Sequence, residues 1–166
     1  MLTFINSDSM RRMLFITLSA CFLWTCSKEA DVQLVKFTDT GCSNGSVEPD
    51  TRSGNGAGST LMLEYSAQGL VLTRTNAVMN CSIKDGGIVC SISFAGNTLS
   101  VNTYEKDGKT MRCVCPVETM SMTVSGLSLG SDYVLDYMCS GVKYPPIEFC
   151  YEKGLKQLID IDLYTD

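Results

Sequence analysis

The sequence predicts an all-β domain, a single antiparallel β-sandwich, that follows a cleaved N-terminal leader. Short apolar runs with alternating polar residues recur along the chain, and turn-forming residues separate them. No segment of ten or more residues shows a convincing helical stripe, and residues 152–161 are the weak exception. A third observation identifies the leader: an apolar run follows two arginines and is itself followed by a polar stretch.

The leader precedes a sharp change in polarity. Arg11 and Arg12 come before an apolar run over residues 13–24, and polar residues begin at Ser27. A charged start and about a dozen apolar residues are typical of a secretory signal. A membrane-spanning helix needs ~20 apolar residues, so the run is too short to span. We expect residues 1–25 to be a signal peptide, with Met10 as a plausible true start.

The cysteine that ends this run makes the leader more specific. Leu23 to Cys26 resembles the lipobox of bacterial lipoproteins, although Trp24 and Thr25 stand where smaller residues are preferred. The following Ser-Lys-Glu is similar to the tag of Bacteroidota-type lipoproteins exported to the cell surface. The resemblance implies that Cys26 is acylated and that a lipid anchors the protein in the envelope, at the outer membrane or cell surface. A plain cleaved signal or an uncleaved anchor is the alternative.

Composition excludes several classes of function. Cleavage before Cys26 leaves 141 of the 166 residues, enough for one domain, and changes the formal charge from −5 to −6. An acidic chain argues against nucleic-acid partners and anionic lipid headgroups, because phosphate binding needs clustered Lys and Arg. The chain has no histidine, which excludes catalysis by imidazole.

The mature chain divides into a tether and a sandwich. We expect residues 26–59 to be the lipidated N-terminus and a Gly-rich tether, in which residues 32–37 could form a first strand. Residues 53–59 read Ser-Gly-Asn-Gly-Ala-Gly-Ser, a flexible-loop composition. Residues 60–166 form the predicted sandwich. Its strands are expected at 61–66, 70–81, 88–95, 98–105, 110–117, 120–125, 133–139, 147–151 and 158–164.

Three two-residue turn signals predict successive hairpins. Asp85-Gly86, Gly96-Asn97 and Asp107-Gly108 each lie between two alternating runs, and Asp-Gly is a strong hairpin signal. The first turn places Cys81 opposite Cys90 in a non-hydrogen-bonded pair, where Cα atoms lie ~4.5 Å apart. That separation is within reach of a disulfide.

Seven cysteines remain after the leader and Cys26 are set aside. An exported chain meets oxidising conditions, so disulfides are the default, and an odd number leaves at least one thiol without an intramolecular partner. The candidate pairs are Cys81 with Cys90 and Cys139 with Cys150. The remaining three, Cys42, Cys113 and Cys115, have no assigned partner. A zinc or other soft-metal site is the alternative, but the spacing fits poorly. We predict no metal or cofactor.

A second resemblance lies at the start of the predicted strand 133–139. Leu127, Gly130 and Tyr133 match the L-x-x-G-x-x-Y corner of fibronectin type III and immunoglobulin-like sandwiches. In those families the tyrosine hydroxyl bonds back to the backbone. The resemblance implies a structural role for Tyr133 and an immunoglobulin-like sandwich. The Cys-Trp-Cys core of antibody domains is absent from the sequence.

These observations favour a membrane-anchored envelope lipoprotein that acts as a non-catalytic binding or structural module. Its partners would be the membrane, through the lipid, and a protein or glycan ligand. One alternative is an accessory subunit of a surface nutrient-capture or adhesion complex. Another is a small enzyme that uses carboxylates or cysteine, because scattered acidic residues and thiols are the remaining candidates for catalysis.

Overall fold

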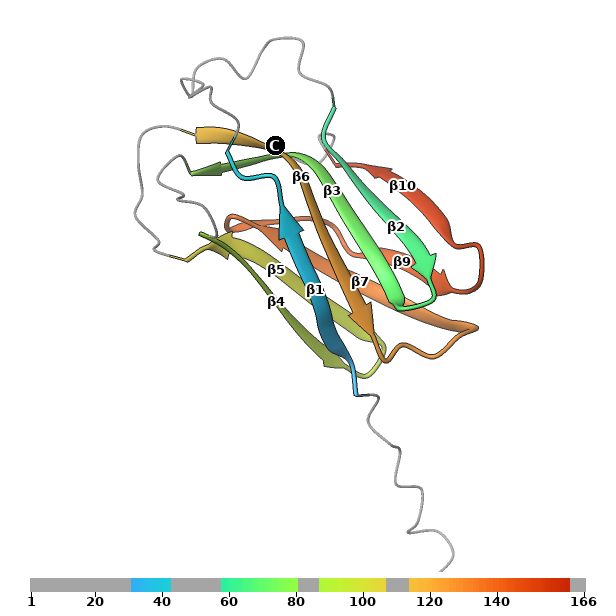
Figure 1. Cartoon of the computed structure of the whole chain (residues 1–166). Coiled ribbons are helices and arrows are strands. Elements are labelled where there is room, and N and C mark those ends of the chain that lie inside the picture. The colour runs from blue at the N-terminus through green and yellow to red at the C-terminus, as the bar shows by residue number, and fades with distance from the viewer. Residues whose placement is uncertain (1–30, 43–57, 81–86, 107–113, 162–166) are drawn as a thin grey trace, which may run out of the picture.

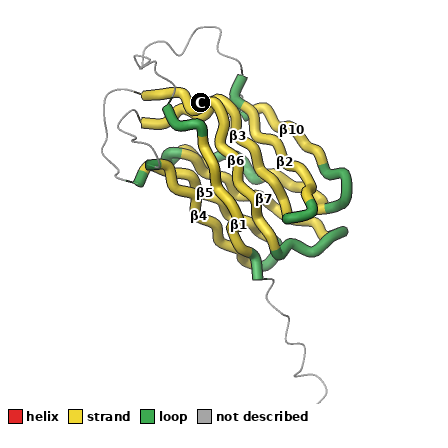
Figure 2. The backbone as a smooth tube through the Cα atoms, viewed as in Figure 1, coloured by secondary structure: helices red, strands yellow, loops and turns green. Residues whose placement is uncertain are grey.

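The computed structural model describes residues 31–42, 58–80, 87–106 and 114–161, and confirms the all-β prediction. Two open sheets pack face to face (Figures 1 and 2). Sheet A has the order β1-β6-β3-β2-β10, and sheet B has the order β4-β5-β7-β8, with β9 also paired to β7. The strands are β1 (Gln33–Asp39), β2 (Thr60–Ser66), β3 (Gly69–Asn80), β4 (Ile88–Ala95), β5 (Thr98–Glu105), β6 (Val114–Ser125), β7 (Ser131–Cys139), β8 (Val142–Lys143), β9 (Ile147–Tyr151) and β10 (Lys156–Asp160).

The first strand belongs to the sandwich. β1 pairs antiparallel with β6, from Gln33 opposite Ser125 to Asp39 opposite Met120. The folded domain therefore includes this segment, and the predicted boundary at residue 60 is too late. The alternation of residues 32–37 was the signal for this strand. The glycine-rich stretch after it suggested a tether, so the sequence did not show that the strand belongs to the sandwich.

One long strand, β6, covers the described part of two predicted strands, 110–117 and 120–125, while residues 110–113 lie outside the described residues. Its buried positions change from odd to even numbers, because Cys115 and Val117 face the core and so do Met120 and Met122. The paired strand β3 changes phase at the same level, where Asn76 has a positive φ of 50°. Asparagine tolerates this conformation better than most residues. The shift in alternation resembles a strand end in the sequence, but here it is a bend shared by two strands.

One of the three predicted hairpins is confirmed. β4 and β5 join at Gly96-Asn97, with Ala95 opposite Thr98 and Ile92 opposite Val101. The other two are wrong, because β3 and β4 lie in different sheets, as do β5 and β6. Two-residue turn signals therefore occur both where the chain forms a hairpin, between β4 and β5, and where it crosses to the other sheet. The register that placed Cys81 opposite Cys90 is therefore wrong, and Cys81 itself lies outside the described residues.

The sheets are antiparallel except at one pair. β5 and β7 are parallel neighbours, from Thr98 beside Val134 to Thr103 beside Cys139. Parallel strands need a crossover connection, and here the chain crosses through β6 in the opposite sheet. The immunoglobulin arrangement has two antiparallel sheets. The domain therefore shares the two-layer architecture of those folds but not their strand order.

The predicted corner residues meet at one end of β7. The Tyr133 hydroxyl accepts a hydrogen bond of 2.9 Å from the backbone amide of Ser128. Gly130 has a φ of +76°, which an L side chain rarely adopts, and Leu127 packs against the core. This is the geometry by which a tyrosine corner fixes the entry into a strand.

The two sheets contribute different side chains to one core. Sheet A supplies aliphatic and thioether groups, namely Leu61, Leu63, Leu70, Leu72, Met79, Met120 and Met122. Sheet B and its connections supply most of the rings, namely Tyr133, Tyr137, Tyr144, Phe149 and Tyr151. Phe94, Tyr133 and Phe149 form a chain of tilted ring contacts at 5.9 and 5.7 Å between centroids. Such contacts add to the stabilisation from burial alone.

A buried arginine interrupts the apolar face of sheet A. Arg74 is 4% exposed, and its guanidinium lies 5.5 Å from the centroid of the Tyr144 ring. One nitrogen, Nη2, donates to the Tyr144 hydroxyl at 3.3 Å. Nε and Nη1 have no hydrogen-bond partner among the described residues. Burying a charged group with unpaired donors is costly, so sheet A holds a destabilising feature in its centre.

Candidate functional site

The structure contains a disulfide that the sequence did not assign. Cys42, just after β1, bonds to Cys115 in β6, with 5.6 Å between Cα atoms and a separation of 73 positions in sequence. No local pattern connects two cysteines so far apart, although both were counted as unpaired candidates. Disulfides persist in oxidising compartments, so this bond suggests an extracytoplasmic location.

The predicted Cys139–Cys150 pair is wrong. Both residues carry free thiols. Cys139 faces the core, with Sγ 3.7 Å from Met79 Sδ, whereas Cys150 lies opposite Asp132, a residue on the outer side of β7. Along β7, Cys139 lies seven residues from Asp132, the residue opposite Cys150, and this corresponds to about 23 Å at ~3.3 Å per residue. Sequence adjacency of the two strands did not reveal that the cysteines occupy opposite faces.

Two of the described free thiols, those of Cys90 and Cys150, are poor nucleophiles. Cys90 is a free, partly buried thiol whose Sγ lies 3.9 Å from Met122 Sδ. Burial raises its pKa from 9.0 to about 11. The pKa of Cys150 is also raised, by desolvation and then by its hydrogen bond to the Asp132 carboxylate. Both thiols stay protonated near neutral pH, and the thiolate is the nucleophilic form.

Several predicted positions lie outside the described residues, among them Cys26, Cys81 and Cys113. The alternative zinc site would use Cys81, Cys90, Cys113 and Cys115, of which Cys81 and Cys113 are not described. Within the described segments, no group of three or more His, Cys, Asp or Glu is placed to hold a metal ion. Nor does any helix of those segments have the length and hydropathy needed to span a bilayer.

Most described tyrosines are structural. Tyr133, Tyr137, Tyr144 and Tyr151 are buried, and Tyr65 packs against Tyr151 at 5.7 Å between ring centroids. Tyr137 stacks on Tyr144, and desolvation raises the pKa of its hydroxyl. Tyr104 is the exposed member, at 37%.

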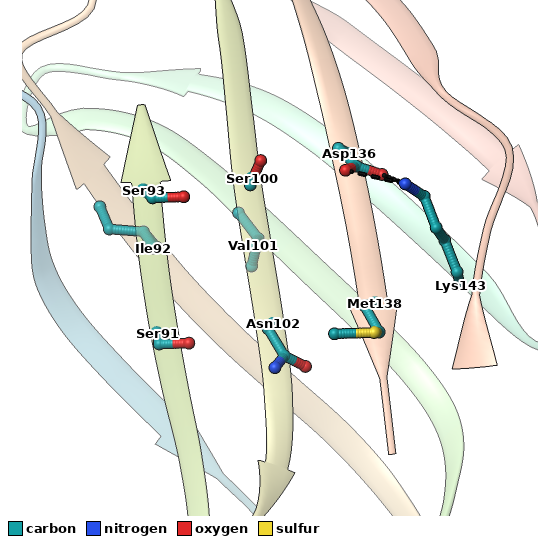
Figure 3. A pocket seen from close by; sticks show the side chains of 9 residues that line it. All are labelled: Ser91, Ile92, Ser93, Ser100, Val101, Asn102, Asp136, Met138 and Lys143. Atoms are coloured by element: carbon teal, nitrogen blue, oxygen red, sulfur yellow. Dashed lines mark hydrogen bonds and ion pairs between the residues drawn. The ribbon is translucent and has the colours of Figure 1, made fainter. Parts of the chain in front are cut away.

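A hollow of about 200 Å³, lined by both polar and apolar side chains, lies on the outer face of sheet B, and we call it the sheet B hollow (Figure 3). Inward and outward side chains alternate along β4, β5 and β7, so their outward residues form rows across the sheet. Small side chains in these rows leave the surface concave. The first row is Ser91, Asn102, Met138 and Lys143, and the second is Ser93, Ser100 and Asp136.

A tight turn brings the cation of the hollow to its anion. Ser140 and Gly141 both have positive φ, 48° and 80°, between the paired residues Cys139 and Val142. Positive φ at both central residues is the pattern of a type I′ hairpin turn. The turn returns the chain as β8, so that Lys143 Nζ lies 3.1 Å from both carboxylate oxygens of Asp136. The Ser-Gly dipeptide was the available signal for this missed strand.

The hollow also contains acceptors without hydrogen-bond partners. Asn102 Oδ1 is inaccessible to solvent and has no partner among the described residues. Asp136 Oδ1 has the ammonium of Lys143 at 3.1 Å but no hydrogen bond with good geometry. Leaving a buried acceptor unpaired costs about 1–3 kcal/mol. Because the carboxylate and the ammonium have opposite charges, their ion pair adds no net charge to the hollow.

A second, acidic hollow of about 460 Å³ lies farther along the same sheet, beside Asp132, Glu148 and Cys150. Two further carboxylates, those of Glu64 and Glu105, have structural partners. Glu64 forms an ion pair with Lys156 at 3.2 Å, and Glu105 accepts a 2.6 Å bond from the Ser140 hydroxyl. These carboxylates stabilise strand pairs and connections.

Comparison of the chain with known protein families, curated proteins and solved structures found no match. What the structure shows by itself is an all-β domain of two packed sheets with a disulfide between Cys42 and Cys115.

Proposed function

We propose that this protein is an extracytoplasmic, lipid-anchored, non-catalytic binding module that presents the sheet B hollow to a neutral polar ligand, such as an uncharged glycan or peptide. The observation that carries the proposal is the concave outer surface of sheet B, where the small polar side chains of Ser91, Ser93 and Ser100 lie beside the Asp136–Lys143 ion pair. Serine hydroxyls both donate and accept hydrogen bonds, so this surface can bind the polar groups of an uncharged ligand.

The chemistry of the described side chains supports a binding role over catalysis. A nucleophilic cysteine needs a lowered pKa, whereas the pKa values of Cys90 and Cys150 are raised. An imidazole base is unavailable because the chain has no histidine. The Asp136 carboxylate has the Lys143 ammonium 3.1 Å from both of its oxygens, so this carboxylate already has a partner within the folded chain.

The fold also changes the expected reach of the lipid anchor. Because β1 starts at Gln33 and pairs with β6, six residues separate Cys26 from the sandwich, whereas the sequence suggested a tether up to residue 59. A chain spans at most ~3.3–3.6 Å per residue, so seven steps give roughly 25 Å. An acylated Cys26 would therefore hold the domain close to the bilayer surface.

The anchor is tested by fractionation of cells that express the full chain. We expect Cys26→Ala to move the protein from the membrane to the soluble fraction, because the acyl thioether cannot form. Cys150→Ser, which removes a thiol on the outer face of sheet B, should stay with the membrane. Retention of Cys26→Ala in the membrane fraction would contradict the anchor without touching the ligand proposal.

The ligand site is tested by NMR titration of the folded protein with neutral disaccharides and an uncharged Ser/Asn peptide. Amide shifts should cluster at Ser91, Ser100 and Asn102, and Asn102→Ala should weaken binding about tenfold, which corresponds to one hydrogen bond. Thr73→Val, on the outer face of sheet A, is the matched control. Shifts that cluster elsewhere, or unchanged affinity in Asn102→Ala, would reject the site.

The alternative, an accessory subunit of a larger complex, predicts a different binding surface. That role would use the edge strand β10, where Leu158 is 67% exposed, because an open edge offers unpaired backbone groups to a partner. Binding of a protein partner that is lost in Leu158→Asp and retained in Asn102→Ala would favour the alternative.

A further inference from the structure

Sheet A ends in a regular edge strand, β10. Among the described strands, β2 is the only neighbour of β10, and Figure 1 shows β10 at the outer margin of the sheet. The ladder with β2 has no register shift, from Lys156 opposite Glu64 to Asp160 opposite Thr60. Such an edge presents backbone donors and acceptors that another strand can pair with.

Other edges of the sandwich are modified in ways that oppose this pairing. β1, the opposite edge of sheet A, has an irregular register between Leu34 and Lys36. β4, an edge of sheet B, contacts β1 of the other sheet (Figure 1). At β9, the Gln157 side chain donates a hydrogen bond of 3.5 Å to the Glu148 carbonyl. Bulges and covering groups protect sheet edges, and β10 has neither within the described segments.

The hydrogen bonds to β2 show which backbone groups of β10 face the edge. The Leu155 carbonyl accepts from the Tyr65 amide, and the Ile161 amide donates to the Ser59 carbonyl, both at 3.0 Å. Hydrogen-bonded and non-hydrogen-bonded positions alternate in an antiparallel pair. The odd-numbered residues of β10 therefore bond to β2, and the amides and carbonyls of the even-numbered residues point away from it.

The same even-numbered residues carry the exposed side chains of the strand. Lys156, Leu158 and Asp160 are all exposed. Leu158, at 67%, is the most exposed large hydrophobic residue of the described segments. An apolar side chain therefore lies at the centre of β10, with a cation two residues before it and a carboxylate two residues after it.

We propose that two copies of this chain form a dimer by antiparallel pairing of their β10 strands about a twofold axis at Leu158. Leu158 then lies opposite Leu158 of the partner subunit, and Lys156 lies opposite the partner's Asp160. All three pairs are in hydrogen-bonded positions, because the even-numbered backbone groups of each copy face the edge. The two five-stranded sheets become one continuous sheet across the dimer.

Charge favours this register over its neighbours. A shift of two residues in either direction places Leu158 opposite a charged side chain and separates the charged pairs. Parallel pairing of identical strands would place like charges beside each other, which is destabilising. In the proposed register the Lys156 ammonium, already 3.2 Å from Glu64, lies between that carboxylate and the partner's Asp160.

The dimer is separate from the proposed ligand site. The sheet B hollow is lined by residues of β4, β5, β7 and β8, whereas the dimer uses the edge of sheet A. Failure of one proposal therefore leaves the other intact. Because β10 has five residues, the interface is of the small class, and we expect weak, concentration-dependent association.

The first test is cross-linking of the full chain by mild oxidation in membranes or detergent. Leu158→Cys places a thiol opposite its copy, with Cα atoms ~5.5 Å apart, and should form a covalent dimer. Met62→Cys is the matched control, because Met62 is the neighbour of Leu158 on β2 and faces the same side. Its Cα would lie about 14 Å from its copy, at ~4.8 Å per strand. The unsubstituted protein gives the background from its own cysteines. Background-level cross-linking in Leu158→Cys, or equal cross-linking in Met62→Cys, would overturn the proposal.

The second test examines the register. Lys156→Cys and Asp160→Cys should each give little covalent dimer alone, because neither position lies opposite itself. A mixture of the two variants should form a cross-linked heterodimer. Efficient cross-linking of Lys156→Cys with itself would contradict the antiparallel register.

The third test is sedimentation of the detergent-extracted protein from micromolar to millimolar concentration. Lys156→Asp should weaken dimerisation about tenfold, because it puts two like-charged pairs in each dimer. The charge swap Lys156→Asp/Asp160→Lys should recover the association. Asn102→Ala, in sheet B, is the control and should leave it unchanged, and melting curves verify that each variant is folded. A monomer at every concentration, or an unchanged equilibrium in Lys156→Asp, would overturn the proposal.

Discussion

The outer faces of the two sheets satisfy their polar side chains in different ways. On sheet A, hydroxyl groups pair with one another and with backbone: Thr60 and Thr75 share a 2.8 Å bond, and the Thr119 amide donates to the Thr40 hydroxyl at 3.1 Å. On sheet B, the Asn102 acceptor lies unpaired in a hollow. The cited hydroxyl groups on the outer face of sheet A bond within the chain, whereas the outer face of sheet B is hollowed and lined by small polar side chains, which supports the assignment of ligand binding to sheet B.

The inner faces differ in a complementary way. Sheet A has the disulfide, most of the leucines and the buried Arg74, whereas sheet B has free thiols and most of the aromatic rings. Covalent stabilisation therefore acts on the sheet without the hollow. A polar surface that leaves an acceptor unpaired costs stability, and the packing and the bond in the opposite sheet offset that cost.

The largest effect expected is from removal of the described disulfide. Cys42→Ser should lower the free energy of unfolding by about 4 kcal/mol, because the bond closes a loop of 73 residues in the unfolded chain. Urea titration measures this loss. Cys150→Ser, in sheet B, should change the free energy little, and an equal loss in both variants would remove the covalent distinction between the sheets.

The next effect compares the two halves of the core. Leu72→Ala in sheet A and Leu135→Ala in sheet B each remove a side chain with 0% exposure. Both should cost about 3 kcal/mol in chemical denaturation, since each leaves a cavity. Leu158→Ala, at 67% exposure, should cost less than about 0.5 kcal/mol. A much smaller loss at Leu135 would show that sheet B is only loosely packed against sheet A.

A smaller effect with the opposite sign is expected at Arg74. Arg74→Met should raise the free energy of unfolding by about 1 kcal/mol, because it removes a buried charge with two unpaired donor atoms and keeps the volume of the side chain. Thermal denaturation at several salt concentrations measures the change. A loss above about 1 kcal/mol would mean that a group outside the described residues pairs with the guanidinium.

The smallest effect concerns alkaline pH and the Cys90 thiol of sheet B. Burial raises its pKa from 9.0 to about 11, so the folded state binds this proton more tightly than the unfolded chain. The resulting stabilisation is complete below pH 9 and is lost as the pH rises toward 11. Cys90→Ala should flatten this decline in unfolding free energy, measured by denaturation between pH 8 and 11. An unchanged slope would assign the decline to other groups.

Local patterns in the sequence predicted most of the strands. Alternation placed these strands within a few residues of their observed bounds, although it divided β6 in two and missed β8. Gly96-Asn97 specified the one hairpin that formed as predicted. The corner motif identified Tyr133, whose hydroxyl accepts the bond from Ser128. These features depend on interactions between residues close in the chain, so local patterns contain the necessary information.

The tertiary structure decided which strands are neighbours, and with them the disulfide and the sheet B hollow. Cys42 meets Cys115 across 73 residues, and Asp136 meets Lys143 because β8 folds back along β7. A turn signal marks where a strand ends but not whether the chain continues in the same sheet or crosses to the other. That choice depends on burying both apolar faces at once, and it is a property of the whole chain.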